Sequence, residues 1–545
     1  MKATMASFVG GGAAWLQAPL LGGQAFQFDR STIALALIAL VLVPVLVSSR
    51  LGGGGGGKET KVPIANPPGP FETWAQKKLE SAHKGMEILR QARTRFGNKP
   101  YKMMTQSGPV IVLPRELASE IRNNPNLSFT RFVEDFPTQD AFTPLHLMDH
   151  PSELIMLVIK KHLTKRLNTV TKPLAQEATF VLDLLMGNKS DWTEANATTL
   201  ALDIVTRLSN RIFLGPEMCR NEEWLDVSKN FTALFTQAVQ RLSPLPRMIQ
   251  NIVYLFDPKC QDLRSQRNRG RRIMRGLVEQ RRRRQAECRA KGLPPPTYND
   301  SVQWLQIEAG VTGVTNYDHC DFQLLLSFLA IHTTSDLLSQ TMIYLAKYPE
   351  SIEELRQEIL EVLPVEGWNK TSLQKLKLLD SAVKEAQRFK PLFTLGLIRK
   401  PTEDTVLPNG LVVRKGIRLV MDTEHLMDPE LYPEPEKFNI HRFADMRREP
   451  GGEFRAPLAS VTADNLSFGL GKHACPGRFF AANEIKLALC HMLLKYDWRL
   501  AEGTSLEPYY FGTLNSVDPI SRLLFKRRKE EIDLDALAVD DDVEE

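Results

Sequence analysis

The chain alternates long stretches of helical periodicity with a few short runs of strand character. Apolar residues recur at helical spacing over residues 321–348 and 351–363, and Pro364 is expected to end the second helix. Residues 108–113 and 410–413 have the pattern of short strands beside turns. We therefore predict a mainly α fold with small β-sheets, an α+β class in which helices dominate.

A long apolar run without charge covers residues 31–49. Its length is near the lower end of the ~17–25 residues that span a bilayer as a helix. A cleavable signal peptide is the alternative, but the 30 residues before the run are long for one. We predict a single-pass transmembrane anchor over residues 31–49, preceded by a lumenal segment of residues 1–30.

The rest of the chain divides by composition into a linker, a large body and a tail. Residues 50–70 form the linker, flexible where glycines follow one another and stiffer where prolines gather. Basic residues follow the anchor directly, which favours a cytosolic body. We predict one globular domain over residues 71–530 and an acidic, disordered tail over residues 531–545.

Overall composition is that of an ordinary globular protein. Hydrophobic residues make up 43% and charged residues 24% of 545 residues, and the formal net charge is +5. Such a modest charge does not imply nucleic-acid binding. The arginine-rich stretch 264–289 is more typical of a solvated helix end, with contact to anionic lipid headgroups as a weaker alternative. Six cysteines lie without paired spacing, which favours reduced thiols facing the cytosol.

A glycine-rich loop delivers Cys475 to the start of a predicted helix near the end of the chain. Glycines permit backbone angles closed to other residues and a close approach to a flat ligand, and a helix N-terminus favours a thiolate. A buried structural cysteine would leave the rest of the pattern unexplained. The loop resembles the haem-binding loop of cytochrome P450, with His473 where the family more often has arginine. The resemblance assigns to haem binding Phe468, Gly469, Gly471, His473, Gly477 and, as the axial ligand of iron, Cys475.

Two further features are similar to the same family. Glu385 and Arg388 lie three apart on one predicted helix, where opposite charges can pair. The resemblance implies that Arg442 joins them and that the three residues lock the core beneath the haem. It also implies that Arg399, on a strand beside the haem edge, pairs with a propionate. The family's usual Trp-x-x-x-Arg pattern is absent upstream, where uncommitted candidates for propionate contacts are Lys160, Lys161 and His162.

Threonines interrupt the apolar helix predicted over residues 321–348. Unpaired polar groups cost free energy in a core, although a threonine can bond the carbonyl one turn back. Residues 329–335 resemble the oxygen-activating helix of the family, with His332 where an acidic residue is usual. The resemblance implies that Thr333 steers protons and water toward iron-bound dioxygen. His332 is the candidate for proton relay, because histidine changes charge near pH 7.

The resemblance covers about residues 63–526 and implies a reaction class. A haem b ligated by Cys475 would serve the insertion of one oxygen atom from dioxygen into a hydrophobic natural-product scaffold, by hydroxylation or epoxidation. Filamentous-fungal secondary metabolism, with terpenoid or indole-terpenoid substrates, is the expected setting. The expected electron donor is a membrane-bound NADPH–cytochrome P450 reductase, with cytochrome b5 as a second candidate. The expected location is the endoplasmic reticulum membrane, with the body facing the cytosol.

Alternative functions stay open at this point. Alkaloid, polyketide or peptide scaffolds are alternative substrates. A P450-type isomerase or lyase would rearrange an oxygenated substrate without dioxygen, and His332 in place of an acid allows this reaction. A non-catalytic haem sensor is less favoured, because sensing does not require threonines beside the iron. Whether product formation requires reductase, reduced nicotinamide and dioxygen distinguishes these functions.

Overall fold

The computed structural model describes residues 62–136, 144–150, 152–243, 245 and 247–537. The predicted anchor and the segment before it lie outside these ranges. Among the residues described, no helix is both long and apolar enough to cross a membrane. The description below therefore concerns the predicted body, the end of the linker and the start of the tail.

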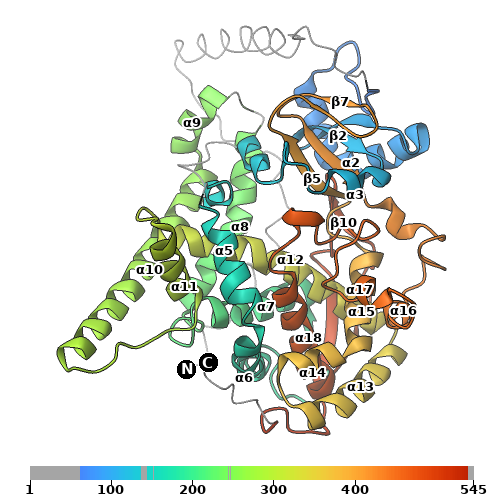
Figure 1. Ribbon diagram of the computed structural model, residues 1–545. Helices are drawn as coiled ribbons and strands as arrows, with labels where there is room; N and C mark the ends of the chain where they lie inside the picture. Colours follow the sequence, from blue (N-terminus) through green and yellow to red (C-terminus); the bar gives the residue numbers. More distant parts are fainter. Residues whose placement is uncertain (1–61, 137–143, 151, 244, 246, 538–545) are drawn as a thin grey trace, which may run out of the picture.

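Helices build most of the molecule, as predicted (Figure 1). Aspartates that precede two of the longest helices accept N–H bonds from the first turn, Asp257 for α10 and Asp318 for α12. The α-helices are α2 (Trp74–Phe96), α3 (Ala118–Ile121), α5 (Leu154–Val158), α6 (Leu167–Leu185), α7 (Ala197–Phe213), α8 (Glu222–Leu242), α9 (Arg247–Phe256), α10 (Pro258–Ala290), α11 (Ser301–Thr312), α12 (His319–Lys347), α13 (Glu350–Glu366), α14 (Lys370–Lys375), α15 (Lys377–Phe389), α16 (Arg442–Met446), α17 (Gly452–Arg455) and α18 (Arg478–Lys495). Shorter turns are η1 (Arg115–Leu117), η2 (Thr130–Asp135), η3 (Pro144–Met148), the π-helical η4 (Ile159–Thr164), η5 (Glu424–Met427) and η6 (Gly471–His473).

Small sheets lie beside the helical body. The largest has the strand order β1-β2-β8-β5-β3; β2 pairs with β8 in parallel and the other neighbours are antiparallel. The strand predicted at 108–113 is β2, and the one predicted at 410–413 is shortened to β7. The strands are β1 (Tyr101–Thr105), β2 (Gly108–Leu113), β3 (Leu127–Ser128), β4 (Thr193–Asn196), β5 (Leu395–Pro401), β6 (Thr405–Val406), β7 (Val412–Val413), β8 (Arg418–Asp422), β9 (Tyr496–Leu500), β10 (Tyr509–Phe511), β11 (Leu514–Ser516) and β12 (Arg522–Arg527).

The long apolar helix predicted over residues 321–348 is α12, which crosses the middle of the molecule (Figure 1). Helices α7, α8, α10, α15 and α18 pack against it, so most of its side chains are buried. The prediction for residues 351–363 needs one correction. Helix α13 continues through Pro364 to Glu366, although the proline supplies no N–H donor there, and it ends where Gly367 adopts a φ of 68°.

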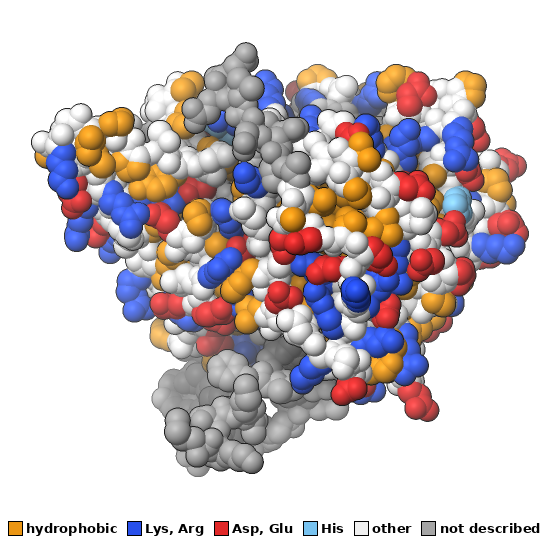
Figure 2. Space-filling view, turned by 90° about the horizontal axis from the view of Figure 1, so that it is seen from below, with side chains coloured by type: hydrophobic (Ala, Val, Ile, Leu, Met, Phe, Trp, Pro, Cys, Tyr) orange, Lys and Arg blue, Asp and Glu red, His pale blue; other side chains and the backbone are white. Residues whose placement is uncertain are grey.

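The surface seen from below carries charges of both signs. Lysine and arginine side chains alternate there with aspartate and glutamate (Figure 2). Ion pairs join many described residues of opposite charge, such as Arg269 and Asp226 at 2.6 Å. This face therefore has no large field of one sign.

Candidate functional site

The loop around Cys475 is closed by its own backbone. The amide of Cys475 donates to the carbonyl oxygen of Phe468 at 2.8 Å, which turns the chain back on itself just before α18. Burial raises the pKa of the Cys475 thiol, whereas the amide of Gly477 and the charge of Arg478 act in the opposite direction. The sulfur therefore lies near an N–H and a cation that both favour its thiolate form. Such surroundings suit a thiolate bound to a cation.

The two glycines before the cysteine are required by the protein itself. Gly469 and Gly471 have φ angles of 71° and 72°, in the left-handed region that other residues avoid. A Cβ on Gly471 would lie only 2.4 Å from the side-chain oxygen of Asn123. That oxygen accepts the amide N–H of Lys472 at 2.7 Å. The sequence predicted a close approach to a flat ligand, but the close neighbour of Gly471 is Asn123, which no motif pointed to.

Gly477 contributes to the site in a different way. Its φ is −87°, and a Cβ built on it would meet nothing within 4 Å. Neither strain nor crowding therefore requires glycine at this position. What Gly477 adds is its amide N–H, which bonds to the cysteine sulfur.

Arg399 is a buried cation on β5 with an incomplete set of partners. A register shift between Gly396 and Arg399 interrupts the pairing of β5 with β8. The guanidinium, 1% exposed, donates to the carbonyls of Arg122 and Leu470 at 3.1 and 3.0 Å, but its Nε has no partner among the residues described. Burial lowers its pKa to about 10, and no described carboxylate compensates.

His473 lies close to the same buried cation. Its Nε2 is buried and has no hydrogen-bond partner among the residues described. Burial, together with the charges of Arg399, Lys472 and Lys160, lowers the pKa of His473 to about 4. Two buried nitrogen atoms without hydrogen-bond partners, in a region of positive charge, fit the carboxylates of a haem, as the resemblance implied for Arg399 and His473.

The three candidates for propionate contacts on η4 do not all lie on the same side of that turn. Lys161 and His162 each contact the carboxylate of Glu308 on α11 at 2.8 Å, and His162 also stacks on Trp304. Lys160 instead lines the hollow beside the cysteine loop. Only Lys160 of the three is therefore near the predicted propionate region.

The threonine and histidine of α12 also face different partners. Thr333 is exposed although Ile331 and Thr334 beside it are buried, and its hydroxyl donates to the carbonyl of Leu329 at 3.2 Å. The Nε2 of His332 lies 3.1 Å from the carbonyl oxygen of Lys229 on α8. Burial lowers the pKa of His332 to about 4, so the ring is neutral near pH 7.

This divergence follows from helix geometry, since consecutive residues of a helix do not share a face. The structure thus does not bring the His332 ring to the Thr333 hydroxyl. Its contact with α8 is a structural one, and a proton relay through His332 stays a prediction.

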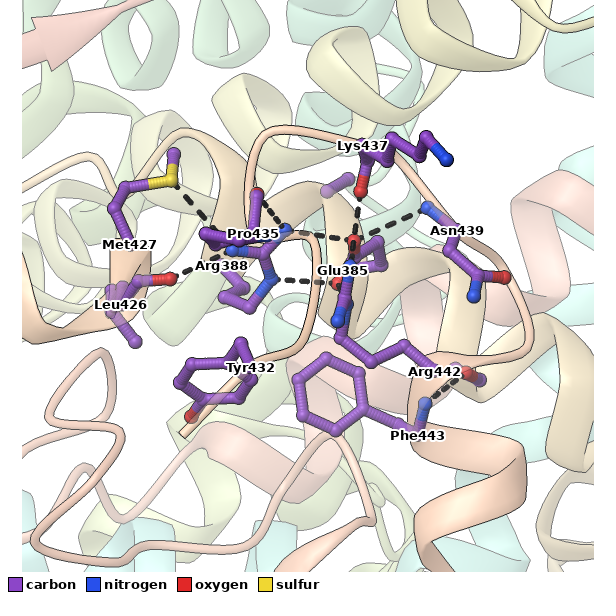
Figure 3. Close-up of polar contacts among 12 residues, drawn as sticks. Glu385, Arg388, Leu426, Met427, Tyr432, Pro435, Lys437, Asn439, Arg442 and Phe443 are labelled. Atoms are coloured by element: carbon purple, nitrogen blue, oxygen red, sulfur yellow. Dashed lines mark hydrogen bonds and ion pairs between the residues drawn. The ribbon is translucent and has the colours of Figure 1, made fainter. Parts of the chain in front are cut away.

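The predicted trio of charged residues comes together where α15 meets the start of α16 (Figure 3). Arg388 makes two bonds of 2.8 Å to Glu385, and the Nε of Arg442 contacts both oxygens of Glu385 at 3.0 Å. The guanidinium groups also donate to backbone carbonyls, from Arg388 to Leu426 and Pro435 at 2.7 Å each. Glu385 and Arg388 are 0% exposed. The trio therefore fixes α15 against the segment that leads to the cysteine loop.

A hollow of about 450 Å³ lies on the outer side of the cysteine loop. Apolar residues such as Leu470 and Phe479 form part of its wall, and no acidic residue lines it. The sequence showed no such cluster, because its cations come from four separate segments. They are Arg122, Lys160, Lys165, Lys472 and Arg478.

Comparisons with known proteins agree with this geometry. The family model for cytochrome P450 matches residues 67–526. Cytochrome P450 monooxygenase hepE of Aspergillus oryzae is 40% identical over 498 residues, 91% of this chain and 90% of its own. Cytochrome P450 monooxygenase eqxH of Fusarium heterosporum is 37% identical over 487 residues, 87% of this chain and 92% of its own. In fold, the chain is similar to the retinoic acid-bound cyanobacterial CYP120A1, with a TM-score of 0.59 at 18% identity, over 86% of this chain and 100% of that one.

Proposed function

The chain belongs to the cytochrome P450 family, and from that premise we propose that it oxidises a hydrophobic natural-product scaffold in fungal secondary metabolism. Family membership makes it a haem-thiolate monooxygenase; the finer proposal is hydroxylation or epoxidation of a terpenoid or indole-terpenoid. Its similarity to fungal monooxygenases supports the setting. The observation that carries the proposal is a row of aromatic rings that leads from the cysteine loop to α12, the helix that carries the exposed Thr333.

Phenylalanine rings form a continuous row from the cysteine loop to α12. The ring centroids of His473 and Phe129 lie 6.1 Å apart. Those of Phe129 and Phe132 lie 5.2 Å apart, and those of Phe132 and Phe136 lie 5.8 Å apart. The row continues at 5.7 Å to Phe235 on α8 and at 5.3 Å to Phe328 on α12. Phe328 lies little more than one turn before Thr333. Such a wall excludes water and favours an apolar, polycyclic substrate over a charged one.

The residues of the site have separate tasks. Cys475 would hold the iron, and Arg399 and His473 its carboxylates. A thiolate-ligated haem supplies the electron density that favours cleavage of the O–O bond of dioxygen. Thr333 donates its proton to Leu329, so the lone pairs on its Oγ1 are free to accept a hydrogen bond from water. That water would be oriented on the substrate side of α12 and could deliver a proton there.

We propose that the electron donor docks over the hollow outside the cysteine loop. Five cations and no acid line this surface, which suits an acidic flavoprotein such as NADPH–cytochrome P450 reductase, or cytochrome b5 as a second donor. The loop itself forms part of the wall, so a partner seated there would lie close to Cys475.

We also propose a membrane location with the body on the cytosolic side. The apolar run at 31–49 supports an anchor. Exposed apolar side chains support a second contact: Phe71 is 97% exposed, and Ile252, Leu255 and Phe256 on α9 are 50–73% exposed. Helices α2 and α9 lie at the same end of the molecule in Figure 1. Sedimentation of the full chain with membranes, and its resistance to carbonate extraction, tests this location; release by carbonate would contradict it.

Reconstitution with defined components tests the reaction. The full chain, reductase, NADPH and labelled dioxygen are combined with terpenoid and indole-terpenoid candidates, and products are identified by mass spectrometry. We expect one labelled oxygen atom per oxidation step and no product when any component is omitted. Turnover without reductase and dioxygen would instead assign the chain to the isomerases or lyases.

A further inference from the structure

The peptide that follows Cys475 is engaged on both of its polar atoms. Its carbonyl belongs to Pro476 and its N–H to Gly477. The hydroxyl of Thr164, the last residue of η4, donates to the Pro476 carbonyl oxygen at 2.8 Å. The Gly477 N–H of the same peptide bonds to the Cys475 sulfur. A single peptide group therefore links the Thr164 hydroxyl to the predicted iron ligand.

Hydrogen bonds in such a chain polarise one another. When a carbonyl accepts a hydrogen bond, the N–H of the same amide becomes a stronger donor, by ~10–30% per bond in condensed-phase estimates. A stronger donor at the sulfur withdraws charge from it. Hydrogen bonds to cysteine sulfurs are among the factors that set the reduction potential of a bound iron centre. The hydroxyl of Thr164 thus acts on the sulfur without touching it.

The π-helical turn η4 keeps Thr164 in this position. Two neighbouring side chains, Lys161 and His162, are bound to Glu308 of α11, whose side chain is 4% exposed. Single π-helical turns are rare in proteins and frequent at functional sites. Here η4 binds α11 through Lys161 and His162, and its last residue, Thr164, contacts the cysteine loop.

We propose that Thr164 is a positioning residue that strengthens the Gly477–sulfur hydrogen bond and thereby raises the reduction potential of the iron held by Cys475. The proposal goes beyond the assignment of Cys475 as ligand. It gives Thr164, the last residue of η4, a role in setting how readily the iron takes up an electron.

Redox titration of the haem-loaded enzyme tests the proposal. Thr164→Val removes the hydroxyl and keeps the shape, and Thr164→Ser keeps the hydroxyl. We expect Thr164→Val to shift the ferric–ferrous equilibrium toward ferric by roughly threefold, about 28 mV for one electron. Thr164→Ser should match the parent. The absorption band of the reduced carbon monoxide complex should persist in all three, since the thiolate stays in place.

Thr171→Val is the matched control. Thr171 is 1% exposed and its hydroxyl donates to Leu167 within α6 at 3.0 Å, so this variant loses a buried hydroxyl without touching the loop. An unchanged potential in Thr164→Val, or an equal shift in Thr171→Val, would overturn the proposal. Loss of haem from both Thr164→Val and Thr164→Ala would also overturn it, because Thr164 would then only hold the loop in place.

Discussion

Buried polar atoms without partners are the residue-scale evidence for the cofactor. The Arg399 guanidinium is almost fully buried, yet among the residues described no carboxylate pairs with it. An uncompensated buried charge is costly, so a protein retains one where a ligand supplies the opposite charge. The Nε2 of His473 is a second such atom in the same region. Haem carboxylates would satisfy both requirements.

Replacement of Arg399 tests this interpretation. We expect Arg399→Gln to lose haem roughly 10–100-fold faster than the parent, because groups that orient a cofactor typically contribute that much to its affinity. Arg399→Lys keeps the charge, and its rate of haem loss should lie between those of the parent and Arg399→Gln. Haem transfer to an acceptor protein measures the rate. Arg414→Gln, at a partly exposed arginine that pairs with Asp404, is the control, and equal rates for Arg399→Gln and Arg414→Gln would refute the propionate role.

Thr333 is the exposed threonine of α12 that we propose to orient water toward the substrate. Thr333→Ala should retain haem but form at least ~10-fold less product per NADPH consumed, since positioned proton donors contribute ~10²–10⁴-fold. Thr341→Ala is the control on the same helix, because the Thr341 hydroxyl bonds Leu337 and is fully buried. Product and NADPH are measured together; unchanged coupling in Thr333→Ala would remove the hydroxyl from the proton path.

At the element scale, a buried charged trio joins α15 to the segment before the cysteine loop. Glu385 accepts bonds from Arg388 on its own helix and from Arg442, which begins α16. The carboxylate is the acidic partner of two guanidinium groups. The position of the loop therefore depends on one acidic side chain that is distant from the iron ligand in sequence.

Glu385→Gln should strongly destabilise the protein. It leaves two guanidinium groups without their carboxylate, and breaking such a buried pair costs ~3–5 kcal/mol. Denaturant unfolding measures the loss. Glu354→Gln removes a half-exposed carboxylate that pairs with His441, and it should cost at most ~1 kcal/mol. If both variants were equally stable, the trio would not stabilise the packing of α15 against the segment before the cysteine loop.

Sequence patterns predicted the elements that carry long, regular signals. The α12 helix, the helix after Cys475 and the Glu385 trio follow from periodicity and motif. Contacts between distant segments were not predictable, because no local pattern encodes them. Asn123 against Gly471 and Thr164 on Pro476 join residues more than 300 positions apart. The direction of His332 and the extension of α13 past Pro364 also depended on packing.

On the scale of the whole molecule, the aromatic row and the proposed docking surface both adjoin the cysteine loop region. The aromatic row lies between the loop and α12, and the cationic hollow lies on the outer side of the loop. In the proposed arrangement, charges on the hollow would steer an acidic partner at a distance, whereas the apolar row would select the substrate by contact. The proposed membrane location would supply both an apolar substrate and a membrane-bound reductase.

Salt and charge reversal test the docking surface. We expect Lys165→Glu and Lys472→Glu each to raise the KM for reductase by ~10-fold at low ionic strength, and added salt to weaken the parent interaction, because exposed charges are screened within ~10 Å at 0.1 M salt. Arg283→Glu, on the exposed end of α10, should leave KM unchanged. An equal rise in KM for all three reversals would contradict docking over the hollow.

Assignment of Cys475 as the iron ligand is the central claim, and one spectrum tests it directly. The reduced, carbon monoxide-treated parent should show the absorption band at about 450 nm that marks a thiolate-ligated haem. Cys475→Ser should lose this band, whereas Cys490→Ser, at a buried cysteine farther along α18, should keep it. Survival of the band in Cys475→Ser would contradict the assignment.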